Sequence, residues 1–171
     1  PATIVPAPLF AHLKSRPALS VPDIQFIIRS VPGVVHPWFP GFKPAFRDGF
    51  GIRPILLHPE SRGHLRLRSA DPRDTMKVFQ NFFSVDSDMA TLREGVRMAR
   101  RATVQTPLDP YRGDEIDPGI SVNNDNEIDA WIRETMVTAH HPACTCPMGV
   151  NETAVLDAEM KVRGAENLRV V

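Results

Sequence analysis

The chain has 171 residues, of which 42% are hydrophobic and 23% are charged, and its 20 Lys and Arg residues balance 20 Asp and Glu residues. This size and composition are those of a folded globular domain, and the balanced charge favours neither nucleic acid nor an anionic membrane as a partner. No apolar run approaches the roughly 20 residues of a membrane-spanning helix. We therefore expect a soluble protein with no nucleic-acid partner and no membrane-spanning segment, and the sequence does not decide between a cytoplasmic and a periplasmic location.

The N-terminal third holds most of the seventeen prolines. Residues 1–20 are predicted to be irregular, because their prolines interrupt helices and central strands. Residues 23–29 are rich in β-branched and aromatic side chains and predict a strand. Residues 31–49 predict a proline-rich loop, either shaping a pocket or forming an ordered surface excursion. Residues 50–57 predict a second strand, bent or at a sheet edge because of Pro54.

A turn and two extended segments are predicted next. Ser61-Arg62-Gly63 is expected to turn into residues 64–69, where apolar and polar residues alternate as in a strand with one wet face. Residues 71–74 ("DPRD") carry a turn signal, and residues 77–79 restart an extended segment.

Two amphipathic helices follow. The first is predicted from apolar residues at three- and four-residue steps, with Asp86 or Ser87 as its N-cap; these residues are Met89, Leu92, Val96 and Ala99. The basic cluster of Arg97, Arg100 and Arg101 is interpreted as a solvated face of this helix. The second helix is predicted to begin at a capping box. Asn124 and Glu127 form that box, and Ile128, Trp131, Ile132 and Met136 form the apolar face.

Residues 168–171 form an apolar, β-like run at which the chain stops. A natural terminus rarely divides such a run, so we expect the chain to be a fragment of a longer protein.

Residues 139–149 ("AHHPACTCPMG") gather two adjacent histidines and both cysteines of the chain. A zinc site could use His140, His141, Cys144 and Cys146, but structural zinc sites pair their ligands on two separated knuckles, and no second cluster exists. A redox dithiol needs Cys-x-x-Cys spacing. Buried, unreactive cysteines are the favoured interpretation.

A histidine held in a rigid turn is the third interpretation. Pro142 restricts His141 to an extended backbone, and an imidazole can accept a proton from an alcohol. From the residue type alone, a hydrogen-bonded structural histidine is the favoured alternative. The chain has no GxGxxG, Walker A or GxSxG pattern, so a hydride acceptor would have to come from elsewhere.

Residues 141–149 ("HPACTCPMG") and 154–171 ("AVLDAEMKVRGAENLRVV") resemble the C-terminal signature of the glucose–methanol–choline (GMC) oxidoreductases. In that family a His-Pro or His-Gly pair opens a G/C-T-C-x-M-G stretch, which a V-V-D…V-x-G…L-R-V-V-D-A-S segment follows. Residues 61–72 ("SRGHLRLRSADP") are similar to the family's S-R-G-x-V-x-L-x-S-x-D-P segment. Two motifs in the family's order make the resemblance specific from about residue 60 onward.

The resemblance implies an α+β fold in which helices back an antiparallel β-sheet. Residues 1–138 would form the substrate-binding domain, and residues 139–171 the catalytic histidine segment and a return toward the flavin-binding domain, including part of its strands. The main Rossmann-type FAD domain would lie outside this chain, in the rest of the same enzyme or in a separate chain. That flavin-binding portion is the expected partner.

The resemblance also implies an FAD-dependent alcohol oxidase or dehydrogenase acting on a small alcohol. His141 would act as general base while hydride passes from the alcohol carbon to flavin N5, giving an aldehyde or ketone. His140 and His141 would both contact FAD, His140 mainly through its backbone. A second catalytic His or Asn would lie beyond Val171, and Cys144 stands where many members of the family have glycine.

Two alternatives remain open at this point. One is a GMC-fold flavoenzyme with lyase or photodecarboxylase chemistry. The other, from a different class, is a metal-binding interaction module that uses His140, His141, Cys144 and Cys146.

Overall fold

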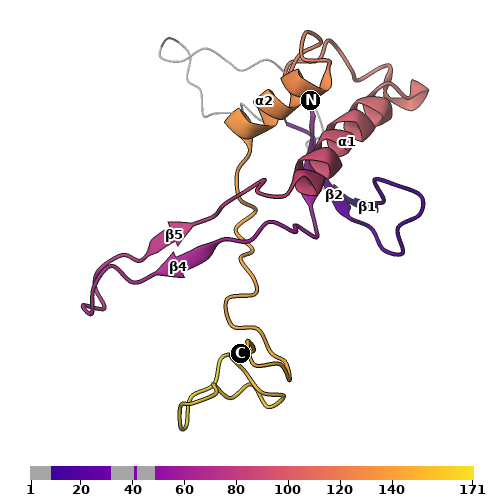
Figure 1. The fold of residues 1–171 in the computed structure, drawn as a ribbon. Coiled ribbons are helices and arrows are strands. Elements are labelled where there is room, and N and C mark those ends of the chain that lie inside the picture. Colours follow the sequence, from indigo (N-terminus) through magenta and orange to yellow (C-terminus); the bar gives the residue numbers. More distant parts are fainter. Residues whose placement is uncertain (1–8, 32–40, 42–48) are drawn as a thin grey trace. The chain divides into compact units, whose positions relative to one another are not determined.

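The structure, a computed structural model, describes residues 9–31, 41 and 49–171 (Figure 1). The chain divides into two compact units, Pro1–Met136 and Val137–Val171. Most of the predicted loop at residues 31–49 lies outside the described residues. Neither helix in the described part of the chain combines the length and the apolar character that crossing a bilayer requires.

A three-stranded antiparallel sheet forms the first part of the larger unit, in the order β1 (Leu9–Leu13), β2 (Ile24–Arg29) and β3 (Gly51–Leu56). Phe26 on the central strand pairs with Ala11 on one side and Pro54 on the other. The strands predicted at 23–29 and 50–57 are confirmed, and β3 lies at an edge, where a residue without an N–H is tolerated.

The prediction that residues 1–20 are irregular is wrong for Leu9–Leu13, which form β1. The prolines at positions 8 and 17 flank these five residues without interrupting them. All five backbone positions are therefore free to pair with β2, and an edge strand needs only one such partner.

Helix α1 (Asp86–Thr103) packs against β2 and β3 (Figure 1). Gly95 allows this close approach, because a Cβ atom there would lie 3.0 Å from Pro54 Cβ and 3.3 Å from Ile24 Cδ1. Ile24 and Phe26, which alternate along β2, are both buried. The side chains that alternate onto one face of β2 thus pack against the apolar side of α1.

A second apolar cluster holds α1 against α2 (Asp125–Thr135). Its buried members, Met89, Val96, Ile128 and Ile132, come from the two predicted apolar faces. Burying side chains of this kind contributes roughly 1.5–3 kcal/mol each. Helix α2 begins at the predicted capping box, in which Asn124 accepts from the N–H of Glu127 and the Glu127 side chain accepts from the N–H of Asn124.

The predicted N-cap of α1 is wrong. Val85 occupies that position, and its side chain makes no capping hydrogen bond. Of the three clustered arginines, Arg101 is exposed and pairs with Glu94 on its own helix. Arg97 pairs with Asp125 of α2, and Arg100, only 24% exposed at its side chain, pairs with Glu115. This face of α1 is therefore largely engaged with other elements rather than solvated.

A two-stranded antiparallel sheet joins β4 (His64–Arg66) to β5 (Lys77–Phe79). The strand predicted over residues 64–69 is confirmed only for its first three residues, and the prediction of one wet face is wrong, because all six residues of this hairpin's strands are exposed. In the predicted turn the N–H of Asp74 donates to the carbonyl of Asp71 at 3.1 Å. Together with the first sheet and the helices, this hairpin confirms an α+β fold with antiparallel sheets. The remaining element is a short 3-10 helix, η1 (Thr106–Leu108).

The smaller unit, Val137–Val171, is held by isolated β-bridges. Met148 pairs with Leu156, Leu156 with Val162, and Lys161 with Arg169. Ala154 and Leu156 are its buried apolar residues. The run at residues 168–171, predicted to be β-like, contributes one bridge and no continuous strand. The assignment of part of this unit to flavin-domain strands stays a prediction.

Candidate active site

The two predicted histidines lie in the segment that follows α2. Both are exposed, and both belong to the smaller unit. The backbone N–H of His140 donates to Thr138 Oγ1 at 3.1 Å, and His140 has φ +60°. A threonine hydroxyl that accepts from the N–H two residues later, followed by positive φ at that residue, forms a tight local turn. This turn spans Thr138 to His140 and ends immediately before His141.

A second left-handed residue, Cys144 with φ +68°, lies on the far side of His141 and Pro142. Glycine adopts this conformation without strain. A glycine at position 144 would therefore fit this backbone without strain. Pro142 fixes its own φ and restricts His141, so the four residues from 141 to 144 have little freedom at either end.

The interpretation of the cysteines as buried packing residues is wrong for this chain. Cys144 and Cys146 are both free thiols and both exposed. The reason is the size of the unit that carries them, which buries only a few side chains and none from this stretch. Across residues 9–31, 41 and 49–171, the structure brings together no group of three or more His, Cys, Asp or Glu side chains that could hold a metal ion.

The segment after the cysteines is anchored by backbone and arginine contacts. The carbonyl of Pro147 accepts from the N–H groups of Val155 and Leu156, at 2.9 and 3.1 Å. The guanidinium of Arg163 donates to the carbonyls of Gly149 (2.5 Å) and Asn151 (3.1 Å). The histidine stretch is thus fixed at its C-terminal end within its own unit.

The Ser61-Arg62-Gly63 motif is held by a residue that the sequence did not single out. Asp88 on α1 is buried, and its carboxylate accepts from the N–H groups of Glu60 (2.8 Å) and Ser61 (2.9 Å). Burial would raise the pKa of Asp88, but hydrogen bonds from the Ser61 side chain and from these N–H groups, with the charge of Arg62, hold its pKa below the ordinary value. The only sequence signal was an acidic residue in the first turn of a helix.

Gly63 completes this anchor. A Cβ atom at Gly63 would lie 2.1 Å from the carbonyl oxygen of Phe79 and 2.7 Å from that of Gln80. Asn81 Nδ2 donates to the carbonyl of Arg62 at 3.0 Å on the same side. The motif therefore has a structural role, since it lets the strand that follows Gly63 lie against the chain after β5.

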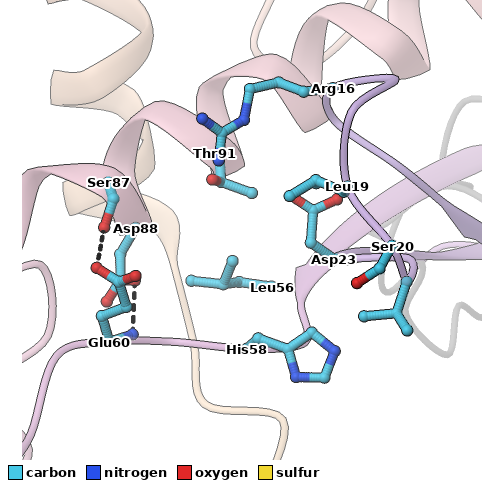
Figure 2. Close-up of a pocket in the computed structure, with 11 residues that line it drawn as sticks. Arg16, Leu19, Ser20, Asp23, Leu56, His58, Glu60, Ser87, Asp88 and Thr91 are labelled. Carbon is cyan, nitrogen blue, oxygen red and sulfur yellow. Dashed lines mark hydrogen bonds between the residues drawn. The ribbon is translucent and has the colours of Figure 1, made fainter.

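A cavity of about 280 Å³ opens elsewhere in the larger unit, between the β1–β2 connection, the end of β3 and the start of α1 (Figure 2). Its polar lining includes Arg16, Asp23, His58, Glu60 and Asp88. The carboxylates are already engaged: Asp23 accepts from Ser15, Glu60 from Ser87, and Asp88 as described above. The cavity contains neither His140 nor His141.

A sequence model of the GMC oxidoreductase family matches residues 59–171 of this chain. The chain belongs to the GMC oxidoreductases. The matched region contains the Ser-Arg-Gly anchor, both helices and the histidine segment, so the resemblance seen in the sequence is confirmed.

Among curated proteins, this GMC chain is 41% identical to mitochondrial choline dehydrogenase from Mus musculus over 161 residues, which are 93% of this chain and 26% of that protein. It is 38% identical to oxygen-dependent choline dehydrogenase from Pseudomonas fluorescens over 159 residues, 93% of this chain and 27% of that protein. The chain thus spans about a quarter of the length of these relatives.

Solved structures of two GMC-like oxidases have the same fold. Pyridoxine 4-oxidase from Mesorbium loti superposes with a TM-score of 0.80 and 26% identity, covering 95% of this chain and 31% of that one. A formate oxidase variant from Aspergillus oryzae, studied for FAD modification, gives a TM-score of 0.76 and 27% identity, covering 88% of this chain and 26% of that one.

The described residues of this GMC chain do not form a complete flavin-binding site. Their strands pair antiparallel, so they provide no βαβ dinucleotide-binding unit. Both imidazoles of the histidine pair are exposed, and the segment that bears them is fixed by hydrogen bonds at each end. The exposed imidazoles of His140 and His141 therefore project from a backbone that is held on both sides.

Proposed function

We propose that this chain is the substrate-domain portion of an FAD-dependent alcohol oxidase or dehydrogenase, with His141 as the general base. The observation that carries the proposal is an exposed histidine, set between a hydrogen-bonded turn and a proline, inside the region that matches the GMC family. A base on a fixed backbone keeps its nitrogen at one distance from the group that it deprotonates.

In this mechanism the neutral imidazole of His141 accepts the proton of the substrate hydroxyl. The rising negative charge on the substrate oxygen makes its carbon a better hydride donor, and the imidazolium then stabilises that oxygen by a charge-assisted hydrogen bond. FAD, when bound, supplies the acceptor for the hydride. The carbonyl product is an aldehyde or a ketone. His140 contributes to cofactor contact through its backbone, since its left-handed conformation directs the peptide groups on either side of it.

Support for small alcohol substrates comes from the relatives. The curated relatives are named for choline, and one structural neighbour is named for pyridoxine; both compounds are alcohols. The remaining, flavin-binding portion of the enzyme is the proposed partner of this chain. The mechanism needs that portion because the described residues offer a base and no dinucleotide site.

The test is His141→Ala in the complete enzyme with bound flavin. Loss of the general base should lower kcat for alcohol oxidation by about 10²–10⁴-fold, because that is the usual contribution of a positioned base. The flavin absorbance should remain, which separates loss of chemistry from loss of cofactor. His58→Ala, which alters an exposed histidine of the other unit, is the matched control and should leave kcat unchanged.

Two results would overturn the proposal. Unimpaired alcohol oxidation by His141→Ala would show that His141 is not the general base. Failure of the unmodified enzyme to reduce its flavin with any of a panel of primary and secondary alcohols would point instead to lyase or photodecarboxylase chemistry on the same fold.

A further inference from the structure

We propose that Thr138 is a positioning residue for His141, acting through the turn at His140. This inference rests on the proposed function, because it concerns the orientation of the same base. Nothing in the family signature quoted above includes position 138.

The geometry of the turn carries the argument. A non-glycine residue in the left-handed region costs roughly 1–2 kcal/mol, and His140 holds φ +60°. The hydroxyl oxygen of Thr138 accepts the N–H of His140 at 3.1 Å, and this bond offsets that cost. Without it, the backbone at His140 would relax toward the common β or α regions.

A change at His140 propagates directly to the base. Pro142 leaves His141 little backbone freedom, so a rotation about the backbone of His140 moves the Cα–Cβ direction of His141 as a rigid unit. The half-buried Thr138 precedes two exposed histidines, so close packing of their side chains does not fix them. Among the described residues, the Thr138 hydroxyl is the side-chain group that holds the backbone of this turn.

Threonine suits this role better than a generic polar residue. Its β-branched side chain has few allowed χ1 rotamers, so the acceptor oxygen is held in place at small entropic cost. Valine has the same shape and lacks the acceptor. Serine keeps the acceptor and loses the methyl group that restricts it.

The experiment compares Thr138→Val with Thr138→Ser in the complete flavin-loaded enzyme. Thr138→Val should lower kcat for the alcohol by about tenfold or more, since a misplacement of about 1 Å can cost up to a hundredfold. Thr138→Ser should keep most of the kcat of the unmodified enzyme. Thr153→Val is the matched control in the same unit, because it removes a hydroxyl that bonds Asn151 at 3.2 Å, and it should leave kcat within about twofold.

A double-variant cycle provides the readout that a merely structural role would not give. If Thr138 acts through His141, Thr138→Val should have no further effect on kcat in a His141→Ala background. Equal losses in both backgrounds, or a Thr138→Val enzyme with unchanged kcat, would overturn the inference. These failures differ from failure of the proposed function, in which His141→Ala by itself leaves turnover intact.

Discussion

Arg93 on α1 and Asp129 on α2 form a two-point ion pair, in which Nε donates to Oδ1 at 2.6 Å and Nη2 donates to Oδ2 at 2.7 Å. The remaining Nη1 of Arg93 donates to Asp125 at 2.9 Å. One guanidinium thus joins two carboxylates spaced one helical turn apart. A planar fork is required for this arrangement, and the two side chains of the main pair are only 20% and 22% exposed.

We predict that Arg93→Lys lowers the free energy of unfolding by roughly 1 kcal/mol, because an ammonium group cannot make the paired contact with Asp129. Thermal unfolding of the complete protein measures the effect. Arg101→Lys is the control, since the Arg101 guanidinium pairs with Glu94 of its own helix and its side chain is 60% exposed. Equal melting temperatures for the two variants would show that the fork contributes nothing.

Substitution of Gly63 tests the anchor of the Ser-Arg-Gly motif. Gly63→Ala should destabilise the protein by about 3 kcal/mol or more, because its methyl group would overlap the backbone at Phe79 and Gln80, which cannot move as a side chain can. Gly51→Ala should be far milder, since its added Cβ meets only the Val31 carbonyl oxygen, at 3.7 Å. Chemical denaturation curves of both variants should separate them, and overlapping curves would contradict the close approach.

Asp88 gives the fold a pH-dependent component. Its hydrogen bonds hold the folded pKa below the unfolded value, so the ionised carboxylate stabilises the fold above roughly pH 4, and this stabilisation is lost as the pH falls through the folded pKa. Asp88→Asn should cost about 1–3 kcal/mol at neutral pH, because Glu60 and Ser61 donate to different carboxylate oxygens and an amide places an NH2 donor where one of them stood. The difference between the melting temperatures of Asp88→Asn and the unmodified protein should become smaller in acid.

The control for that titration is Asp86→Asn, which changes an exposed carboxylate in the same helical turn. At neutral pH it should lower the melting temperature far less than Asp88→Asn does, because Asp86 is exposed and Asp88 is buried. A constant gap between Asp88→Asn and the unmodified protein from pH 7 to pH 3 would be incompatible with an ionised, hydrogen-bonded Asp88.

The left-handed turn predicts unequal tolerance at His140. His140→Asn should keep most turnover, because asparagine accepts positive φ and retains the N–H that bonds Thr138. His140→Val should lower turnover by about tenfold, since a β-branched residue is strongly disfavoured there. Steady-state kinetics of the flavin-loaded enzyme measures both. A loss with asparagine as large as with valine would mean that the imidazole itself, rather than the backbone, is needed.

Local signals predicted the elements that depend on local contacts. The capping box of Asn124 and Glu127 and the apolar face of α2 lie within a dozen residues, and the structure confirms both. The predicted caps of α1, Asp86 and Ser87, lie inside the helix, and the Ser87 hydroxyl donates to Glu60 instead of capping. Asp88 of the same turn binds the backbone of Glu60 and Ser61. The sequence of the helix alone does not indicate these contacts, because their partners lie 27 or 28 residues earlier in the chain.

The candidate site divides in the same way. The order and spacing of the histidine and Ser-Arg-Gly motifs were sufficient to indicate the family, which the match over residues 59–171 confirms. Exposure of Cys144 and Cys146 could not be read from residue type, because it depends on how little the smaller unit buries. The role of His141 as general base stays a prediction, because it depends on the flavin-binding portion that we propose as the partner of this chain.

The two outer strands of the three-stranded sheet differ in what they can accept. β3 carries Pro54, which has no N–H, and α1 lies against that strand. β1 carries no proline, and its Leu9 and Phe10 side chains are more than half exposed. The two edges of the sheet should therefore differ in strand addition: a further strand is favoured beside β1 and hindered beside β3. When the chain is produced by itself, self-association should begin at β1, and a lysine or proline placed in that strand should suppress it.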